Sequence, residues 1–415
     1  MMLAIVFAAL YSFLPSASAD DASKASQAQL PSQSEKAEAM ALYQRAWFLI
    51  KTSYYDKTYN GQNWYRWQHR FDSQLETVED AHRAIATMLE SLNDTDTRMI
   101  HIASSDSMAN ENDCGIGVQI KRHIDNRILI ISTVPGSPAD KAGLQPGDEL
   151  VSVDSQSVAG HTLHYTIDHL RGEPSSEVSI SLQRAGRLVH KTIKRAPLAH
   201  KDVPTVEVLP HNIGYIRLFA LQAPDVAHDL QEALKQLEST SALIIDLRHN
   251  PGGSFRNFVH VAELFAREGT IGSSVDPDGY VHPVEGAGRP LYTRGIVALV
   301  NRGTAKSAES LAAALRENAG ATLVGERTAG ATTIQIPFRL DQETLIIFSG
   351  GRMFSPNGMS YLKKGIEPDV HVSLSDEDLA AGKGPWWCGA GRVSSPGSPE
   401  LKDVQLLSAI ETSTR

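Results

Sequence analysis

Hydrophobic residues follow three different spacings along this chain of 415 residues. In residues 39 to 100, apolar positions recur every three or four residues, as in "VEDAHRAIATMLESL", which predicts helices with one buried face. From Cys114 the pattern changes to short runs of β type, such as "RILIISTV". After about residue 205, apolar strand runs such as "ALIIDLR" alternate with amphipathic helical stretches. We therefore expect a helical segment, a mostly β module and an α/β core with a largely parallel sheet.

The same patterns divide the chain into six segments, as expected for a chain longer than one hydrophobic core usually organises. They are a signal peptide (1–19), a disordered lead (20–38), a helical N-terminal segment (39–112), a β module (113–197), an α/β core (198–379) and a loose tail rich in Gly, Pro and Ser (380–415).

The first residues form a short apolar run that ends in "ASA". A small-residue triplet after such a run is typical of a secretory signal, with cleavage after Ala19. The alternative is a single membrane anchor, but the run is shorter than the roughly 20 apolar residues that a spanning helix needs. We expect an exported protein, periplasmic or extracellular, with no membrane span after signal cleavage.

Net charge and motif content exclude several classes of function. The formal net charge is −9, whereas a nucleic-acid-binding surface normally shows a basic excess. The sequence has no zinc-like cysteine spacing, no histidines at metal-ligand spacing and no P-loop. We expect no nucleic-acid partner, no metal and no cofactor, and the sequence specifies no oligomeric state.

The run "GIGVQI", followed by "VPGSPADKAGLQPGDELVSVDSQSV", resembles a PDZ domain. A Gly-rich loop before a strand leaves backbone N–H groups available, here those of Gly115, Ile116, Gly117 and Val118. In a PDZ domain such groups take the terminal carboxylate of a peptide, while the strand edge pairs with the peptide backbone. The alternative is that these glycines only shape a β-turn.

Four further motifs, "ALIIDLRHNPGG", "VNRGTAKSAE", "ATLVGERTAGA" and "GIEPDV", occur in the order found in C-terminal processing, or tail-specific, serine peptidases of the S41 type. The similarity spans about residues 40 to 372 and includes the order of helical lead, PDZ module and α/β core. The resemblance implies hydrolysis of peptide bonds near protein C-termini. The PDZ module would capture the tail, so the implied partners are protein or peptide C-termini.

Two features of these motifs have a catalytic and a structural interpretation. Gly252 and Gly253 follow a buried strand, where their N–H groups can donate to a developing oxyanion or simply form a turn. Ser307 begins an amphipathic helix. It is either a nucleophile, with the helix dipole and the N–H of Ala308 stabilising the intermediate, or an N-cap.

The sequence also departs from the family pattern at the nucleophile. The family nucleophile stands three residues before the acidic residue of this helix. Counting back from Glu309 reaches Lys306, and Ser307 lies one place late. Lys306 is a poor partner for Ser307 because adjacent residues at a helix start point in different directions. Ser307 is a nucleophile only if another group takes its proton.

The positions of the general base are also changed. One branch of the family has a Lys where this chain has Ala331, and another has a His where this chain has Asp96, although the expected Gln is present as Gln335. His249, beside the glycine pair, is the best local substitute, with a solvated loop residue as the simpler interpretation. Two hypotheses follow: a serine-type peptidase with Ser307 as nucleophile, and an inactive S41-like pseudopeptidase that serves as a peptide-binding scaffold.

Overall fold

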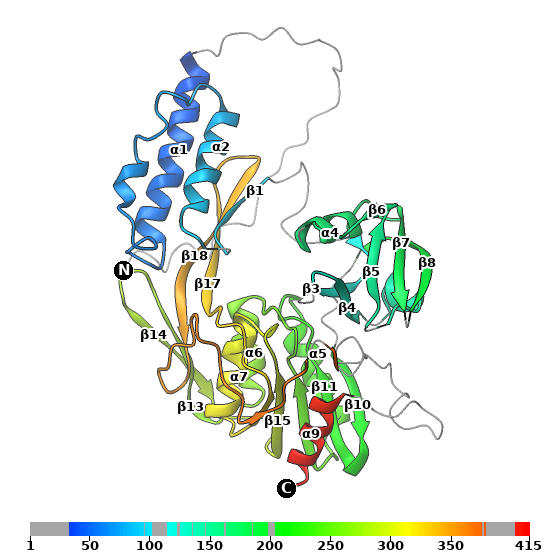
Figure 1. Cartoon of the computed structure of the whole chain (residues 1–415). Helices are drawn as coiled ribbons and strands as arrows, with labels where there is room; N and C mark the ends of the chain where they lie inside the picture. Colours follow the sequence, from blue (N-terminus) through cyan, green and yellow to red (C-terminus); the bar gives the residue numbers. More distant parts are fainter. Residues whose placement is uncertain are drawn as a thin grey trace, which may run out of the picture.

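In the computed structural model, the chain forms a helical unit, a β module and an α/β core (Figure 1). The predicted signal peptide lies outside the described residues. The residues described are 33–94, 96–101, 114–122, 125–134, 136–145, 147–161, 163–184, 186–197, 204–375, 377–378 and 403–415.

The helical unit consists of α1 (Gln33–Ser53), the 3-10 helix η1 (Trp64–Trp67) and α2 (Val78–Glu90). A capping box starts α2: the Thr77 side chain accepts from the N–H of Asp80, and the Asp80 carboxylate accepts from the N–H of Thr77. The apolar positions predicted from the spacing face each other in one buried cluster. The helical prediction for this region is therefore confirmed at α1 and α2.

The beginning of α1 differs from the expected boundary. Residues 33 to 38 belong to the helix and not to the disordered lead that the polar composition predicted. Lys36 Nζ lies 2.5 Å from a carboxylate oxygen of Glu76. In addition, Glu, Lys and Ala, which make up most of this turn, are good helix formers. Continuing the packed helix by one polar turn therefore costs little.

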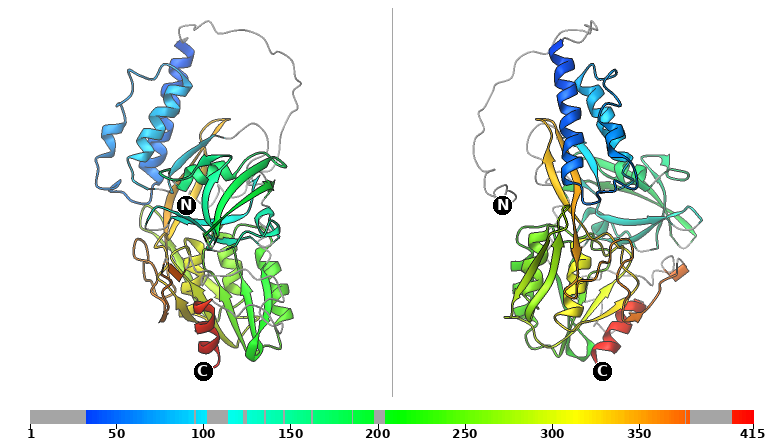
Figure 2. Two further views of the ribbon diagram at one scale, coloured as in Figure 1. Left: turned by 45° about the vertical axis from the view of Figure 1, so that its right-hand side comes forward. Right: turned by 90° about the vertical axis from the view of Figure 1, so that its left-hand side faces the viewer.

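A long β-hairpin connects the core to the helical unit (Figures 1 and 2). It is formed by β17 (Thr333–Arg339) and β18 (Thr344–Phe354), and its residues Ile346 and Phe348 are buried in the cluster of α1 and α2. The strand β1 (Arg98–His101) pairs antiparallel with β18. The N-terminal segment thus also contributes a strand. Its pairing with β18 fixes the position of the loop before β1.

The β module is inserted between β1 and the core through a two-stranded stem. Its main sheet has the order β3-β4-β5-β7-β8, with β6 paired to β5. Ser137 accepts from the N–H of Asp140 and caps α3, a short helix within "SPADKAGL". The elements are β2 (Cys114–Gly115), β3 (Val118–Arg122), β4 (Ile128–Thr133), α3 (Pro138–Lys141), β5 (Glu149–Val153), β6 (Gln156–Ser157), α4 (Leu163–Leu170), β7 (Glu177–Arg184), β8 (Arg187–Lys194) and β9 (Ala196–Pro197), and β2 pairs with β9.

The core sheet has the order β10-β11-β12-β15-β16-β19, parallel except for β10. Its strands are β10 (Thr205–Leu209), β11 (Ile213–Arg217), β12 (Ala242–Asp246), β15 (Gly295–Val300), β16 (Thr322–Gly325) and β19 (Val370–His371), and η2 (Pro210–Asn212) joins the first two. The helices are α5 (Val226–Gln236), α6 (Phe255–Glu263), α7 (Ser307–Glu317) and α9 (Val404–Ser413), and β13 (Glu268–Val275) and β14 (Val281–Ala287) join the hairpin sheet.

Both faces of the core sheet are covered, as the continuous apolar strands predicted. Leu243 and Ile245 of β12 are buried in the cluster of α5, α6 and α7. Ile244, between them, is buried in the cluster of α9 on the other face. Alternate residues of one strand therefore serve two different helical layers, and the predicted α/β architecture is confirmed.

The end of the chain differs from the predicted loose tail. Residues 404 to 413 form α9, which buries Leu406 and Ala409 against the sheet. The guanidinium of Arg248 donates to the carboxylate of Asp403, with both nitrogen–oxygen distances at 2.8 Å. A short amphipathic helix and a buried ion pair thus hold residues that composition alone assigned to a loose tail.

Candidate active site

The turn between β15 and α7 presents Lys306. Lys306 has φ 55° and ψ −125°, a backbone conformation that non-glycine residues rarely adopt and that costs on the order of 1–3 kcal/mol. A strained strand-to-helix turn of this kind lifts the nucleophile above the sheet in α/β hydrolases. Lys306 is also the N-cap of α7, so Ser307 is the first helical residue. The residue at the corner of the turn is therefore the lysine.

The ammonium of Lys306 forms an ion pair with Asp96. Its Nζ lies 2.8 Å from Asp96 Oδ1, and the two side chains are 28% and 18% exposed. Asp96 belongs to the loop before β1, and its other oxygen lies 3.5 Å from Thr333 Oγ1 on β17. The sequence placed Asp96 and Lys306 at altered family positions, but it did not indicate that these two residues contact each other.

Ser307 points toward the glycine loop. Its hydroxyl donates to the carbonyl oxygen of Gly253 at 3.2 Å. Within the described residues, no histidine, lysine or carboxylate contacts Ser307 Oγ at hydrogen-bond distance. His249 is held by Asn301, whose Nδ2 donates to His249 Nε2 at 2.8 Å and whose Oδ1 accepts from the N–H of His249.

Gly252 and Gly253 allow the loop after β12 to touch the Lys306 turn. Gly252 has φ 87°, and a Cβ atom there would lie 2.9 Å from the Cβ of Lys306 and 2.9 Å from the nitrogen of Ser307. A Cβ on Gly253 would lie 1.9 Å from the carbonyl oxygen of Leu221. Only glycine fits at either position, because any side chain would collide with backbone.

Two backbone N–H groups at this contact are available. The N–H of Gly252 donates to Asn250 Oδ1 at 2.9 Å, and that of Ala308 donates to the carbonyl of Ala305 at 3.0 Å. Within the described residues, the N–H groups of Gly253 and Ser307 have no acceptor. Each can donate to a carbonyl or carboxylate oxygen of a ligand. Sequence reasoning missed the N–H of Ser307, which belongs to the first turn of a helix.

Glu309 holds the start of α7 in place. Its carboxylate is fully buried and accepts from the N–H groups of Lys306, Gly330 and Ala331 and from the hydroxyl of Thr328. Burial raises the pKa of Glu309, and the four hydrogen bonds offset only part of that increase. The carboxylate thereby ties the loop 328–331 to the Lys306 turn.

The loop 328–331 contains Ala331, which the motif resemblance aligned with one family base. Ala331 offers no proton acceptor in its side chain, but its N–H binds Glu309. Further along β17, Gln335 Nε2 is buried with no hydrogen-bond partner in the described residues, and so is the hydroxyl of Ser349, its neighbour on β18. Buried polar groups without partners are rare and costly. The pair is therefore an unsatisfied polar spot inside the hairpin sheet.

The loop that begins the β module also has available donors. Gly115 ends β2 and Val118 begins β3, so Ile116 and Gly117 lie between two ladders. Gly117 has φ 79°, which favours glycine. In the part of the chain that the structure covers, the N–H groups of Ile116 and Gly117 have no acceptor.

The described residues contain no group of three or more His, Cys, Asp and Glu side chains that could hold a metal ion. A search of the same residues for membrane spans finds no helix with the length and apolar character to cross a bilayer.

Comparison with known proteins decides the family. Residues 212–372 match the model of peptidase family S41, and residues 130–184 match that of the PDZ domain. A carboxyl-terminal-processing protease of Synechocystis sp. is 32% identical over 355 residues, which is 81% of either chain. The chain belongs to peptidase family S41. The resemblance found in the motifs is therefore confirmed.

Further relatives of this S41 chain include the carboxy-terminal processing protease CtpA of Bacillus subtilis, which is 31% identical over 80% of this chain and 68% of its own. Among solved structures, a photosystem II D1 C-terminal processing protease has a TM-score of 0.64 and 27% identity, covering 81% of this chain and 93% of its own. At the level of the family, these relatives support a serine-type peptidase, a hydrolase acting in proteolysis.

Proposed function

We propose that this S41 protein captures the C-terminal segments of proteins and holds them at the Lys306 turn, and that Lys306 has replaced the hydrolytic serine. The single observation that carries the proposal is the strained strand-to-helix turn at Lys306. It puts an ammonium group at the kind of turn where α/β hydrolases present their nucleophile. The protein would thus be a pseudopeptidase that serves as a peptide-binding scaffold.

The chemistry of the turn supports binding over hydrolysis. The ammonium of Lys306 is paired with Asp96 and, while protonated, has no lone pair with which to attack a carbonyl. A serine hydroxyl is a weak nucleophile unless a base within hydrogen-bond reach takes its proton. Ser307 instead donates to Gly253, and Ala331 provides no base.

Two sets of donors would hold the captured segment. The N–H groups of Ile116 and Gly117 would receive the terminal carboxylate, in the manner of a PDZ domain. The N–H groups of Gly253 and Ser307 would donate to carbonyl oxygens of the captured segment. The ammonium of Lys306, whose charge Asp96 offsets, adds N–H donors at the second place.

A second candidate function is hydrolysis with Ser307 as nucleophile. The observation that favours it is the position of Ser307 Oγ, 3.2 Å from the carbonyl oxygen of Gly253 and at the N-terminus of α7. The helix dipole and the N–H of Gly253 would stabilise a tetrahedral intermediate there. This candidate requires a base that moves into reach when a segment binds.

One experiment separates the two candidates. The purified full chain is mixed with a fluorescein-labelled unstructured peptide, prepared with a free or an amidated C-terminus, and binding is read by anisotropy and cleavage by mass spectrometry. We expect tighter binding of the free acid and no cleavage, in the wild type and in Ser307→Ala alike. Cleavage that disappears in Ser307→Ala would establish the second candidate, and equal binding of both peptides would reject tail capture.

A gain-of-function variant tests the same proposal from the other side. Lys306→Ser with Ala331→Lys should create peptidase activity, while either change alone should create little, because nucleophile and base act as a unit. Lys235→Ser with Ala331→Lys is the matched control, since Lys235 is exposed on α5. A double variant that keeps its circular dichroism spectrum and stays inactive would contradict the replacement of a serine and lysine pair.

We further propose that the protein acts after export, in the periplasm or outside the cell. The support is the apolar run of residues 1–19 with its "ASA" ending. The captured segments would then be the C-termini of other exported proteins.

A further inference from the structure

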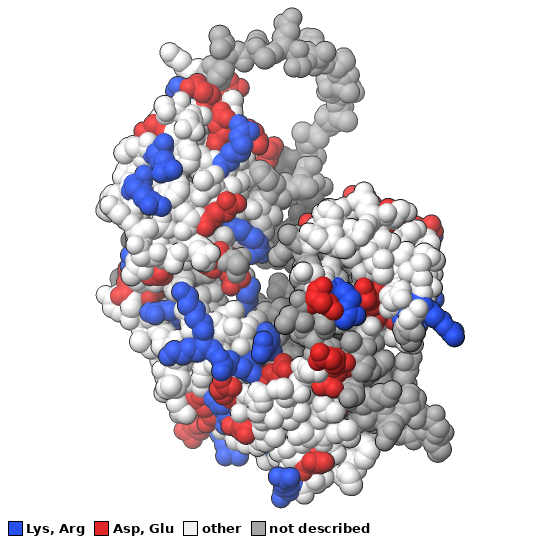
Figure 3. All heavy atoms as spheres, viewed as in Figure 1, with Lys and Arg blue, Asp and Glu red and all other residues white. Residues whose placement is uncertain are grey.

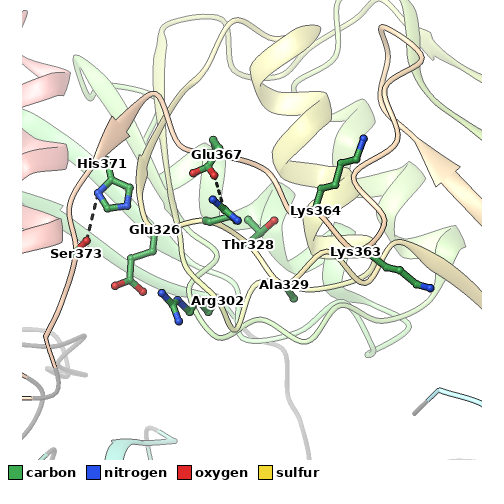
Figure 4. A pocket seen from close by; sticks show the side chains of 10 residues that line it. Arg302, Glu326, Thr328, Ala329, Lys363, Lys364, Glu367, His371 and Ser373 are labelled. Carbon is green, nitrogen blue, oxygen red and sulfur yellow. Dashed lines mark hydrogen bonds and ion pairs between the residues drawn. The ribbon is translucent and has the colours of Figure 1, made fainter. Parts of the chain in front are cut away.

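A polar pocket lies beside the Lys306 turn, at the carboxyl ends of β15, β16 and the segment before β19 (Figure 4). Ligands of α/β proteins bind at this edge of the sheet. The pocket has a volume of about 550 Å³. It is lined by Arg302, Glu326, Arg327, Thr328, Ala329, Lys363, Lys364, Glu367, His371 and Ser373.

The pocket carries an excess of positive charge. Four of its lining residues are Lys or Arg and two are Glu, which leaves a net charge of plus two when His371 is neutral. Arg327 is paired with Glu367. In the space-filling view, Lys and Arg side chains gather on this side of the core, beneath the α1 and α2 unit (Figure 3). The excess positive charge belongs to a chain whose net charge is −9, so it is a local feature.

Three of the cations make no ion pair with a described carboxylate, although Asp56 is close enough to Lys363 to be influenced by its charge. Within the described residues, no carboxylate lies within ion-pair distance of Arg302, Lys363 or Lys364. All three residues are exposed. They are therefore available to an anionic ligand, although water and salt weaken each single contact.

The floor of the pocket is fixed to the candidate active site. The N–H of Ala329 donates to the carbonyl of Thr304 at 3.0 Å, and the N–H of Lys363 donates to the carbonyl of Gly330 at 2.6 Å. Arg302 itself lies on the loop that leads to Lys306. The same loops thus form the pocket and the Lys306 turn, so a segment held at the turn lies next to the pocket.

The directions of the side chains favour an extended ligand. Figure 4 shows Lys363 and Lys364 leaving their turn in different directions, with Arg302 on another side of the pocket. A compact anion such as phosphate is usually bound by donors that converge on it. Charges spread around an open pocket instead match several carboxylates along one chain. An acidic peptide fits this arrangement, and its continuity with the Lys306 turn favours the captured segment as the source.

We propose that this pocket, through Arg302, Lys363 and Lys364, selects for acidic residues in the captured protein segment. This inference rests on the proposed capture of C-terminal segments. It adds that a segment with Asp or Glu residues upstream of its end binds better than a neutral one of the same length.

The experiment uses four labelled peptides and the full chain. The peptides combine an acidic or a neutral upstream stretch, with Glu replaced by Gln, with a free or an amidated C-terminus, and affinity is read by anisotropy. We expect Lys363→Ala with Lys364→Ala to weaken binding of the acidic free acid about fivefold to tenfold at low salt and to leave the neutral peptide unchanged. Lys194→Ala with Lys235→Ala removes the same charge from exposed positions outside the pocket lining and should have no such effect.

The outcomes separate this inference from the proposed function. Equal affinity for acidic and neutral peptides, with the free acid still preferred over the amide, would overturn the acidic selection and leave tail capture intact. No preference of either kind would overturn both. Vesicles containing phosphatidylglycerol form a further arm: sedimentation that depends on Lys363 and Lys364, without any peptide preference, would overturn the inference in favour of a lipid surface.

Discussion

The ion pair between Arg248 and Asp403 should hold α9 on the core sheet. Asp403 and Arg248 are each 1% exposed, and both guanidinium nitrogens donate to the Asp403 carboxylate at 2.8 Å. Arg248 directly precedes His249 and the glycine loop. The Asp403→Asn variant removes the charge while keeping the size of the side chain.

The expected magnitude follows from what remains after the change. Breaking a buried ion pair by removing one partner costs about 3–5 kcal/mol. Arg248 keeps its contacts with Asp246, at 2.6 Å for the closest pair of atoms, and Asn still offers one acceptor oxygen. Asp403 also caps α9, but Asn caps a helix equally well. We therefore expect the opening of α9 to become easier by about 2–3 kcal/mol, or about 30-fold to 150-fold.

Amide hydrogen exchange measures this local opening directly. A chain with several domains does not unfold in one step, so a global unfolding free energy is the wrong quantity. Exchange of the amides in residues 404 to 413 should accelerate by the factor above in Asp403→Asn. Glu411→Gln makes the same chemical change at an exposed position of α9 and should leave the exchange nearly unchanged. Exchange in Asp403→Asn within twofold of the wild type would refute the role given to this ion pair.

Two further predictions concern acid stability and export. Burial favours a raised pKa of Asp246, but Arg248 and Arg217 outweigh it and lower the pKa to about 2, so its stabilising contribution is complete above about pH 4 and lost as the pH falls through about 2. The urea midpoint of the core should fall over that range, and by less in Arg217→Met; an equal fall in both would contradict the assignment. Mature protein should begin at Asp20 on N-terminal sequencing, and an intact Met1 or Met2 would reject the export signal.

Local patterns in the sequence predicted most of the elements. The spacing of apolar residues identified α2 and the buried strand β12. These signals succeed because the apolar residues on the buried face of a helix or strand recur with the period of that element. The four motifs also placed the chain in its family, because they require particular residues at fixed spacing.

The start of α1 and the helix α9 were predicted less well. The first turn of α1 is polar, whereas α9 has apolar residues at helical spacing within a tail whose composition as a whole is rich in Gly, Pro and Ser. Lys36 with Glu76, and Arg248 with Asp403, fix these segments through partners far away in the sequence. Composition reports the preference of a segment in isolation, and it cannot include a partner that only folding supplies.

The sequence by itself determined the family and the order of the parts, and it predicted Lys306 at the position counted for the family serine. Only the tertiary structure decided that Lys306 occupies the strained corner and pairs with Asp96, and that Gly253 and Ser307 have the available N–H groups. The physical reason is that residue type and spacing constrain one element at a time. A backbone angle at a turn, the partner of a charge and the direction of an N–H group depend on which elements meet, and those contacts form between segments that are distant along the chain.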